Sequence, residues 1–132
     1  MPASIRAFRY ARFTMPEVTV RQLDDVAAQL HPLGGDQMRV ANCFEGQRFT
    51  QGVIALTAQT SPAKQIAHQE ADLLCYVISG TGRLRSGTTD LPLKQGTLCH
   101  IPAHVPHDFQ ATGDRELVLL FTLVEAPAAP AP

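Results

Sequence analysis

From residue 36 onward, short apolar segments alternate with clusters of turn-forming residues. The segments are rich in β-branched side chains, and the clusters between them contain Gly, Ser, Pro and Asp. Many short segments of this kind are typical of an all-β sandwich or a small barrel. We therefore expect a six- to eight-stranded antiparallel barrel or jelly roll over about residues 36–125, with strands at Met38–Cys43, Gly52–Thr57, Leu73–Ile78, Gly82–Arg85, Thr97–Ile101 and Glu116–Val124.

One segment before the barrel has a helical period. Apolar residues at the i, i+3, i+4 and i+7 spacing are Leu23, Val26, Ala27 and Leu30. Thr19 and Gln22 have the spacing of a capping box, and the Gly34-Gly35 pair stops the pattern. These features predict a single helix over residues 20–30, packed outside the barrel. A doubly wound α/β fold would need helices between its strands, so the pattern excludes that fold.

The two ends of the chain read differently from the middle. Residues 1–18 have mixed polarity and predict an extended arm, whereas residues 126–132 are Ala/Pro repetition and predict a flexible tail. The expected organisation is therefore an arm, a single domain over residues 19–125 and a tail. The apolar residues of the arm have no obvious partner in their own barrel, so the arm is expected to cover the open sheet edge of a second copy.

Composition narrows the classes of function. The chain has 132 residues, of which 45% are hydrophobic and 17% charged, a balance that suits one folded domain. Its net charge is -1 and it has no Trp, so neither a basic surface nor a set of stacking aromatics suggests nucleic-acid binding. No apolar run is long enough to span a membrane. Three cysteines form no paired motif, which favours a reducing cytoplasmic setting.

Histidines concentrate in two segments. Three of the five histidines lie within residues 100–107, and His68 opens a second segment in which Glu70 and Asp72 follow at two-residue steps. In a strand, side chains alternate between faces, so these three would project the same way. Imidazole and carboxylate groups on one face are suitable ligands for a metal, but a solvated strand face would show the same pattern.

These two segments resemble the motifs of the cupin superfamily. Gly80, in the YVISGTG turn, matches the glycine that ends the first motif of the family. Gly96, Pro102 and His107 match the second motif with its spacing, and His68 stands where a first-motif histidine is expected. The resemblance covers about half the chain. It implies an RmlC-like antiparallel jelly roll and a site inside the barrel.

The match departs from the family pattern at several ligand positions. Leu73 stands at the position of the family glutamate. If His68 is the first motif histidine, Glu70 occupies the position of the second; in another register His68 is the second and Ile66 replaces the first. His104 replaces a glycine of the second motif, and its last residue is changed as well. The usual set of three histidines and one glutamate is therefore incomplete.

The resemblance implies one divalent metal, such as Fe, Mn, Ni or Zn, held inside the barrel. Two imidazoles and one carboxylate would form a facial triad with open coordination positions. The residues carried over to that set are His68, Glu70 and His107, with Asp72, His100 and His104 as reserves. His68 and His107 are expected to face each other across the interior. In the alternative, no metal is bound, and both histidines serve as hydrogen-bonding groups or as a base.

The functions that follow stay broad. The first is a metal-dependent enzyme, such as a dioxygenase, isomerase or lyase, acting on a small acid or sugar; whether it is catalytic, and through which residues, stays open. The alternative is a ligand-binding or sensory protein without turnover. The resemblance also implies a homodimer, and neither nucleic acid nor membrane is expected as a partner. Arg83 and Arg85 are expected on a solvent face, and Asp108 is expected to be exposed, since strand neighbours face opposite sides.

Overall fold

The computed structural model describes residues 16–34, 37–58 and 64–126, which form one short helix and nine strands. The predictions for the arm up to residue 15 and for the tail from residue 127 lie outside the described residues. No helix of the described residues is long and apolar enough to cross a membrane. The elements are α2 (Leu23–Ala27), β1 (His31–Pro32), β2 (Met38–Glu45), β3 (Phe49–Leu56), β4 (Ala71–Ser79), β5 (Gly82–Ser86), β6 (Thr89–Leu93), β7 (Leu98–Ile101), β8 (Asp108–Ala111) and β9 (Leu117–Glu125).

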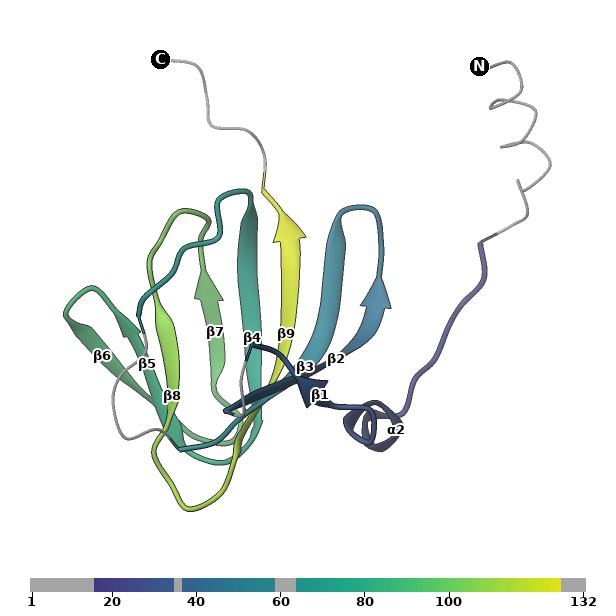
Figure 1. Ribbon diagram of the computed structural model, residues 1–132. Coiled ribbons are helices and arrows are strands. Elements are labelled where there is room, and N and C mark those ends of the chain that lie inside the picture. The colour runs from purple at the N-terminus through teal and green to yellow at the C-terminus, as the bar shows by residue number, and fades with distance from the viewer. Residues whose placement is uncertain (1–15, 35–36, 59–63, 127–132) are drawn as a thin grey trace, which may run out of the picture.

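The strands form two sheets in two layers (Figure 1). Six strands form the larger sheet in the order β1-β2-β3-β9-β4-β7, and three form the smaller one in the order β6-β5-β8. Every strand pair in both sheets is antiparallel, so the predicted all-β antiparallel class is confirmed. Within the described residues, the two sheets share no continuous ladder. Of two isolated bridges, a parallel one joins Ala58, which follows β3, to Ala111 of β8, and an antiparallel one joins Ile66 to His107.

Alternation along β4 separates an inner from an outer face of the larger sheet. Leu73, Cys75 and Val77 are buried, whereas Leu74 and Tyr76 between them are exposed. The buried set faces the smaller sheet, because side chains at two-residue steps share a face. The core between the layers consists of Leu56, Leu73, Cys75, Val77, Leu84, Leu93, Ile101, Ala111, Leu117 and Leu119.

A second core lies on the outer face of the larger sheet, where α2 covers it. Val26 of the helix is buried with Ala41, Cys43 and Val53 of β2 and β3. Since Leu56 of β3 belongs to the inner core, this arrangement explains why β3 carries buried residues on both faces. The helix lies outside the barrel, as predicted.

The helix itself is shorter than the predicted span of residues 20–30. It begins after Gln22, whose extended backbone and lack of a side-chain cap mean that the capping box with Thr19 does not form. Asp24 and Asp25 in the first turn favour the helix start through the helix dipole. A helix this short depends on the packing of Val26 rather than on its own propensity.

Three strands were absent from the prediction. The strand β6 has four exposed residues in succession and contains Pro92, so it lacks a period of two. It lies at the edge of its sheet, where a proline is tolerated because no ladder partner needs its missing N–H. The strands β1 and β8 have only two and four residues, too few for a pattern to appear.

The turn between β4 and β5 requires glycine. Gly80 has a φ of +86°, in the left-handed region that L side chains rarely adopt. A Cβ there would also clash with the carbonyl oxygen of Glu116. Backbone geometry therefore explains why residue 80 of the YVISGTG turn is a glycine.

Candidate functional site

A cavity of about 400 Å³ lies between the two sheets. The larger sheet supplies most of its wall through inward side chains of β2, β3, β4 and β9. The remainder comes from the segment around Ile66 and from the start of β8. The lining residues are Leu33, Met38, Val40, Ile54, Leu56, Lys64, Ile66, His68, Leu73, Cys75, His107, Asp108, Phe109, Leu119, Phe121 and Leu123.

The structure brings His68 and His107 together at this cavity. Their ring centroids are 5.5 Å apart, with an interplanar angle of 45°. Backbone bonds hold the two segments: Ile66 and His107 exchange N–H···O bonds of 2.9 and 2.8 Å, and the His104 N–H donates to the His68 carbonyl at 2.7 Å. The spacing of the two rings therefore follows from backbone pairing.

The hydrogen bonds of the two rings differ. His107 is 3% exposed, and its Nδ1 lies 3.0 Å from the carbonyl oxygen of Val105. A carbonyl only accepts, so Nδ1 is the donor and Nε2 of the neutral ring keeps its lone pair. Among the described residues, His68 has no hydrogen-bond partner for either ring nitrogen. Burial first, and then the electrostatic influence of His107, lower the pKa of His68 below its usual 6.5, so the neutral form of its ring is favoured at pH 7.

Asp108 is buried, so the prediction that it is exposed is wrong. Its carboxylate oxygens accept hydrogen bonds from Nε and Nη2 of Arg85 at 3.0 and 2.7 Å, and its side chain is 6% exposed. Asp108 and Arg85 stand directly opposite each other on β8 and β5. This pairing, which a single strand's alternation cannot reveal, offsets the cost of burying the charge. Arg85 is correspondingly half-buried, whereas Arg83 is exposed and pairs with Asp90.

Glu70 does not line the cavity. The strand β4 begins at Ala71, so strand alternation does not extend back to His68. Glu70 is exposed, and Asp72 belongs to the outward set of β4. The expectation that His68, Glu70 and Asp72 share a face is therefore wrong, because His68 lies in an irregular segment.

The reserve residues of the predicted metal set lie outside the cavity as well. Asp72 lies 3.1 Å from Nε2 of His100 and accepts the Ala103 N–H at 3.0 Å. These bonds, the one from Ala103 first, lower the pKa of the Asp72 carboxyl. His104 is exposed, with Nδ1 3.0 Å from Oε1 of Gln69. Each of these side chains already has a protein partner.

The donor set of the cavity does not fit a three-ligand metal site. Two imidazoles converge there, and the adjacent carboxylate of Asp108 is held by Arg85. Across residues 16–34, 37–58 and 64–126, no three His, Cys, Asp or Glu side chains are grouped so that they could hold a metal ion. A facial triad needs a carboxylate beside its two imidazoles.

Cys75 and Lys64 line the cavity, although the sequence analysis did not assign them to it. Cys75 stands opposite Cys99 on the neighbouring strand, and burial, followed by the influence of Cys99, raises its pKa to about 12. It is therefore a thiol rather than a thiolate at pH 7. The alternation of β4 could have placed Cys75 inside. The irregular segment that carries Lys64 has no such signal.

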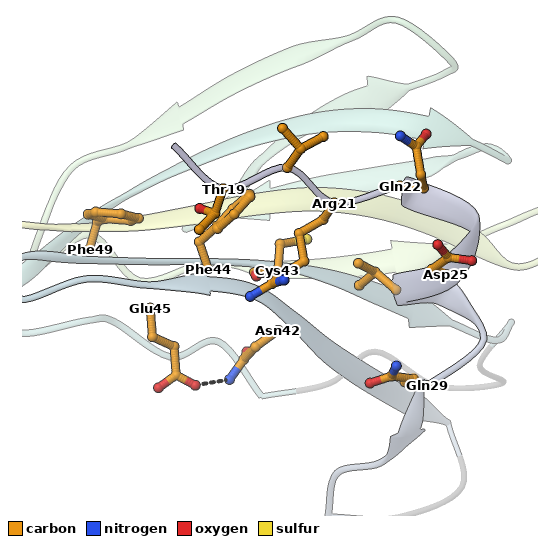
Figure 2. A pocket seen from close by; sticks show the side chains of 12 residues that line it. Thr19, Arg21, Gln22, Asp25, Gln29, Asn42, Cys43, Phe44, Glu45 and Phe49 are labelled. Atoms are coloured by element: carbon orange, nitrogen blue, oxygen red, sulfur yellow. Dashed lines mark hydrogen bonds between the residues drawn. The ribbon is translucent and has the colours of Figure 1, made fainter. Parts of the chain in front are cut away.

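A larger hollow of about 880 Å³ lies on the outer face, between residues 19–29 and the strands β2 and β3 (Figure 2). Three of its polar side chains, Arg21, Asn42 and Glu45, already have protein partners. Asn42 donates to Glu45 at 2.7 Å, and Arg21 donates to the Cys43 carbonyl at 2.9 Å while lying over the ring of Phe44. None of its described lining residues is a histidine. We therefore place the candidate site in the smaller cavity, where hydrogen-bonding groups are left without protein partners.

Solved structures share this fold. A protein described as a predicted oxalate decarboxylase from Thermotoga maritima has a TM-score of 0.70 at 16% identity, covering 81% of this chain and 99% of that one. TT1209 from Thermus thermophilus has a TM-score of 0.67 at 20% identity, covering 82% and 98%. The cupin domain of Cnp3 from Schizosaccharomyces pombe has a TM-score of 0.67 at 17% identity, covering 83% of this chain and 75% of that one. At such identities the likeness shows the fold alone.

Sequence comparison supports the same assignment. No match was found among curated proteins. The family model described as "Cupin domain" matches residues 52–123, which is more than half of the chain. That range contains His68, Gly80 and His107, the positions that carry the motif resemblance and, for the two histidines, the cavity pair. With its two antiparallel sheets around an inner cavity and this family match, the chain belongs to the cupin superfamily.

Proposed function

We propose that this protein binds a small organic molecule in the cavity between its sheets, without a metal ion as the anchor. The observation that carries the proposal is the pair of adjacent imidazoles, His68 and His107, whose remaining ring nitrogens have no protein partner in the described part of the chain. Pockets that bind small molecules are mostly apolar and contain a few converging polar groups, which is the composition of this cavity.

The predicted metal-dependent enzyme lacks support from the donor set, since Glu70 is exposed and Asp108 is engaged by Arg85. One observation favours catalysis by proton transfer as a second candidate. A neutral His68 is a suitable base near pH 7, and His107 has its Nδ1 fixed by a carbonyl. An isomerase reaction needs such a pair, but binding is the function that the geometry supports best.

The proposal is tested with fluorinated probes that are detected by ¹⁹F NMR: fluorobenzene, 4-fluorophenol, 4-fluorobenzoate and 6-fluoroglucose. Leu123→Trp fills the cavity and should abolish binding of whichever probe binds. Val124→Trp, on the outward face of the same strand, is the matched control and should bind like the wild type. Circular dichroism checks that both variants fold. If no probe binds, or if Leu123→Trp binds as well as the control, the proposal is wrong.

We also propose that two copies associate through the exposed outer face of β4 and β7. Leu74, Tyr76 and Leu98 are 44%, 40% and 76% exposed there, and Tyr76 stands directly opposite Leu98. This apolar surface continues the outer core beyond the part that α2 covers. The Asp72–His100 pair at its edge places both an acidic and an imidazole group beside it, which suits a two-fold contact between identical surfaces.

Light scattering at micromolar concentration tests this association. The wild type should be a dimer, and Leu98→Glu should be a monomer, because a charge would be buried at the contact. Leu91→Glu, on the exposed edge strand β6 of the other sheet, should leave the dimer intact. A monomeric wild type would contradict the proposal.

The cytoplasmic location is also part of the proposal. All three cysteines are free thiols, and Cys75 faces Cys99 across neighbouring strands without a disulfide. Free thiols in this arrangement are typical of a reducing compartment.

A further inference from the structure

The cavity has hydrogen-bonding capacity at one end only. Twelve of its sixteen lining residues are apolar or, for Cys75, a buried thiol, and the polar exceptions are Lys64, His68, His107 and Asp108. Lys64 is exposed to solvent, and both carboxylate oxygens of Asp108 accept hydrogen bonds from Arg85. Among the described lining residues, the two imidazoles are the groups left to interact with a molecule inside.

Those imidazoles offer a defined combination of donor and acceptor. Nε2 of His107 is an acceptor, because Nδ1 of that ring donates to the Val105 carbonyl. The neutral ring of His68 carries one N–H donor and one acceptor, neither of which is used by a described residue. The ring centroids are 5.5 Å apart, a spacing at which one oxygen atom beside the two rings can reach a nitrogen of each. A hydroxyl group, which donates once and accepts as well, matches this combination.

The apolar walls argue against two other classes of ligand. A sugar would bring several hydroxyl groups, and each one without a partner would cost about 1–3 kcal/mol. A carboxylate would bring a full charge into a cavity where Arg85 already holds Asp108, His68 is neutral and the one described lining lysine, Lys64, is exposed to solvent. Such a charge is expensive to bury without a cation.

We infer that the cavity takes a neutral, mainly hydrocarbon molecule with a single hydroxyl group, such as a phenol, whose O–H donates to Nε2 of His107 and whose oxygen accepts from His68. This inference rests on the proposed function and names its ligand class. Size is consistent with it. A cavity of roughly 150 Å³ holds benzene, so about 400 Å³ accommodates a ring with substituents.

The same four probes test the class of ligand. 4-Fluorophenol should bind most tightly, with an affinity about three- to ten-fold above that of fluorobenzene, which is the contribution of one neutral hydrogen bond. 4-Fluorobenzoate should bind more weakly than the phenol, and 6-fluoroglucose should not bind measurably. Each probe shares the fluorine label, so one competition-free titration per probe suffices.

Variants then assign the contact. His68→Phe and His107→Phe should each remove the advantage of 4-fluorophenol over fluorobenzene and leave fluorobenzene binding in place. His100→Gln, in the outer histidine pair, should leave both affinities unchanged. Because fluorobenzene reports whether the cavity is intact, a variant that misfolds is recognised by loss of both probes.

The outcomes separate this inference from the proposed function. Tighter binding of 4-fluorobenzoate or of 6-fluoroglucose would overturn the hydroxyl inference and leave the binding proposal standing. Equal binding of phenol and fluorobenzene would also overturn it, because the imidazoles would then contribute nothing. If no probe binds at all, both proposals fail.

Discussion

Four histidines form two groups that differ in what their side chains bind: His68 and His107 at the cavity (the inner pair), and His100 on the outward face of β7 with His104 in the loop after it (the outer pair). In the outer pair, His100 contacts the Asp72 carboxylate and His104 contacts Gln69. On the inner side, His68 and His107 contact each other's rings, and only Nδ1 of His107 has a described hydrogen-bond partner. The outer pair therefore serves the loop that it belongs to, whereas the inner pair keeps its hydrogen-bonding capacity for a ligand.

The carboxylates next to the two pairs explain the difference. The Asp72 carboxylate contacts His100 and accepts the Ala103 N–H. Asp108 is adjacent to His107 in the chain, but its carboxylate pairs with Arg85. Adjacency of a histidine and a carboxylate in the sequence therefore does not predict that their side chains bind each other. The partner on the neighbouring strand decides where the carboxylate goes.

The largest expected effect comes from releasing the inner carboxylate. Arg85→Met leaves Asp108 buried without its cation, which should lower the free energy of unfolding by about 3 kcal/mol. Urea denaturation measures it. Adding Asp108→Leu to this variant should recover most of the loss, because a well-packed apolar pair replaces the ion pair. Arg83→Met, which breaks an exposed pair, should cost less than about 1 kcal/mol; an equal loss in both single variants would contradict the contrast.

A smaller effect of opposite sign is expected at His104. Its φ of +73° is unusual for a residue other than glycine, and the cupin motif has glycine at this position. His104→Gly should raise the free energy of unfolding by about 0.5–1 kcal/mol, because relief of the left-handed backbone outweighs the loss of the Gln69 contact. His104→Ala keeps the strain and loses the contact, so it should be destabilising. A stabilising alanine would show that the backbone is not the cause.

Replacing an inner histidine should cost no stability. His68→Phe removes a half-buried imidazole that has no described hydrogen-bond partner, so the free energy of unfolding should stay constant or rise by less than about 1 kcal/mol. Asp72→Ala, on the outer side, should lower the urea midpoint because the Ala103 N–H loses its acceptor. Stability sacrificed for a binding group is a common trade at functional sites. A clear loss in His68→Phe would mean that the inner pair is structural.

The smallest effect is a pH dependence. The folded-state pKa of His68 is below the value of about 6.5 in the unfolded chain, so the unfolded state takes up its proton first as the pH falls. The contribution of His68 to stability is therefore complete above pH 6.5 and is lost as the pH falls through its folded pKa. His68→Phe should show a flatter decrease than the wild type between pH 7 and pH 5. Asp72, whose pKa is lowered from 3.8, changes stability only at lower pH.

The sequence predicts those parts of the fold that repeat at short range. The strand β4 is predictable because Leu73, Cys75 and Val77 alternate with outward residues. The strand β6 has no comparable pattern. The helical period over residues 20–30 predicts α2 but not its short length, since the helix depends on packing against distant strands. The antiparallel class therefore follows from the sequence, while the layer that each short element joins does not.

The candidate site is predictable only in part for the same reason. The motif points to His107 and His68, but the pairing of Asp108 with Arg85 depends on the register between β8 and β5. The direction of Glu70 depends on where β4 begins, at Ala71. Neither fact is local: the first keeps Asp108 on Arg85, and the second leaves Glu70, the carboxylate of the predicted metal set, outside the cavity.

The backbone bonds that link residues 66–68 to residues 104–107 have an evolutionary consequence. They join carbonyl and N–H groups, so they do not depend on which side chains stand at His68 and His107. Substitutions at these two positions can therefore alter the chemistry offered to a ligand while the loop keeps its shape. A pair of positions with that freedom lets related proteins diverge in ligand without redesigning their scaffold. Replacing both positions with uncharged residues other than proline should yield folded variants with new preferences rather than unfolded chains.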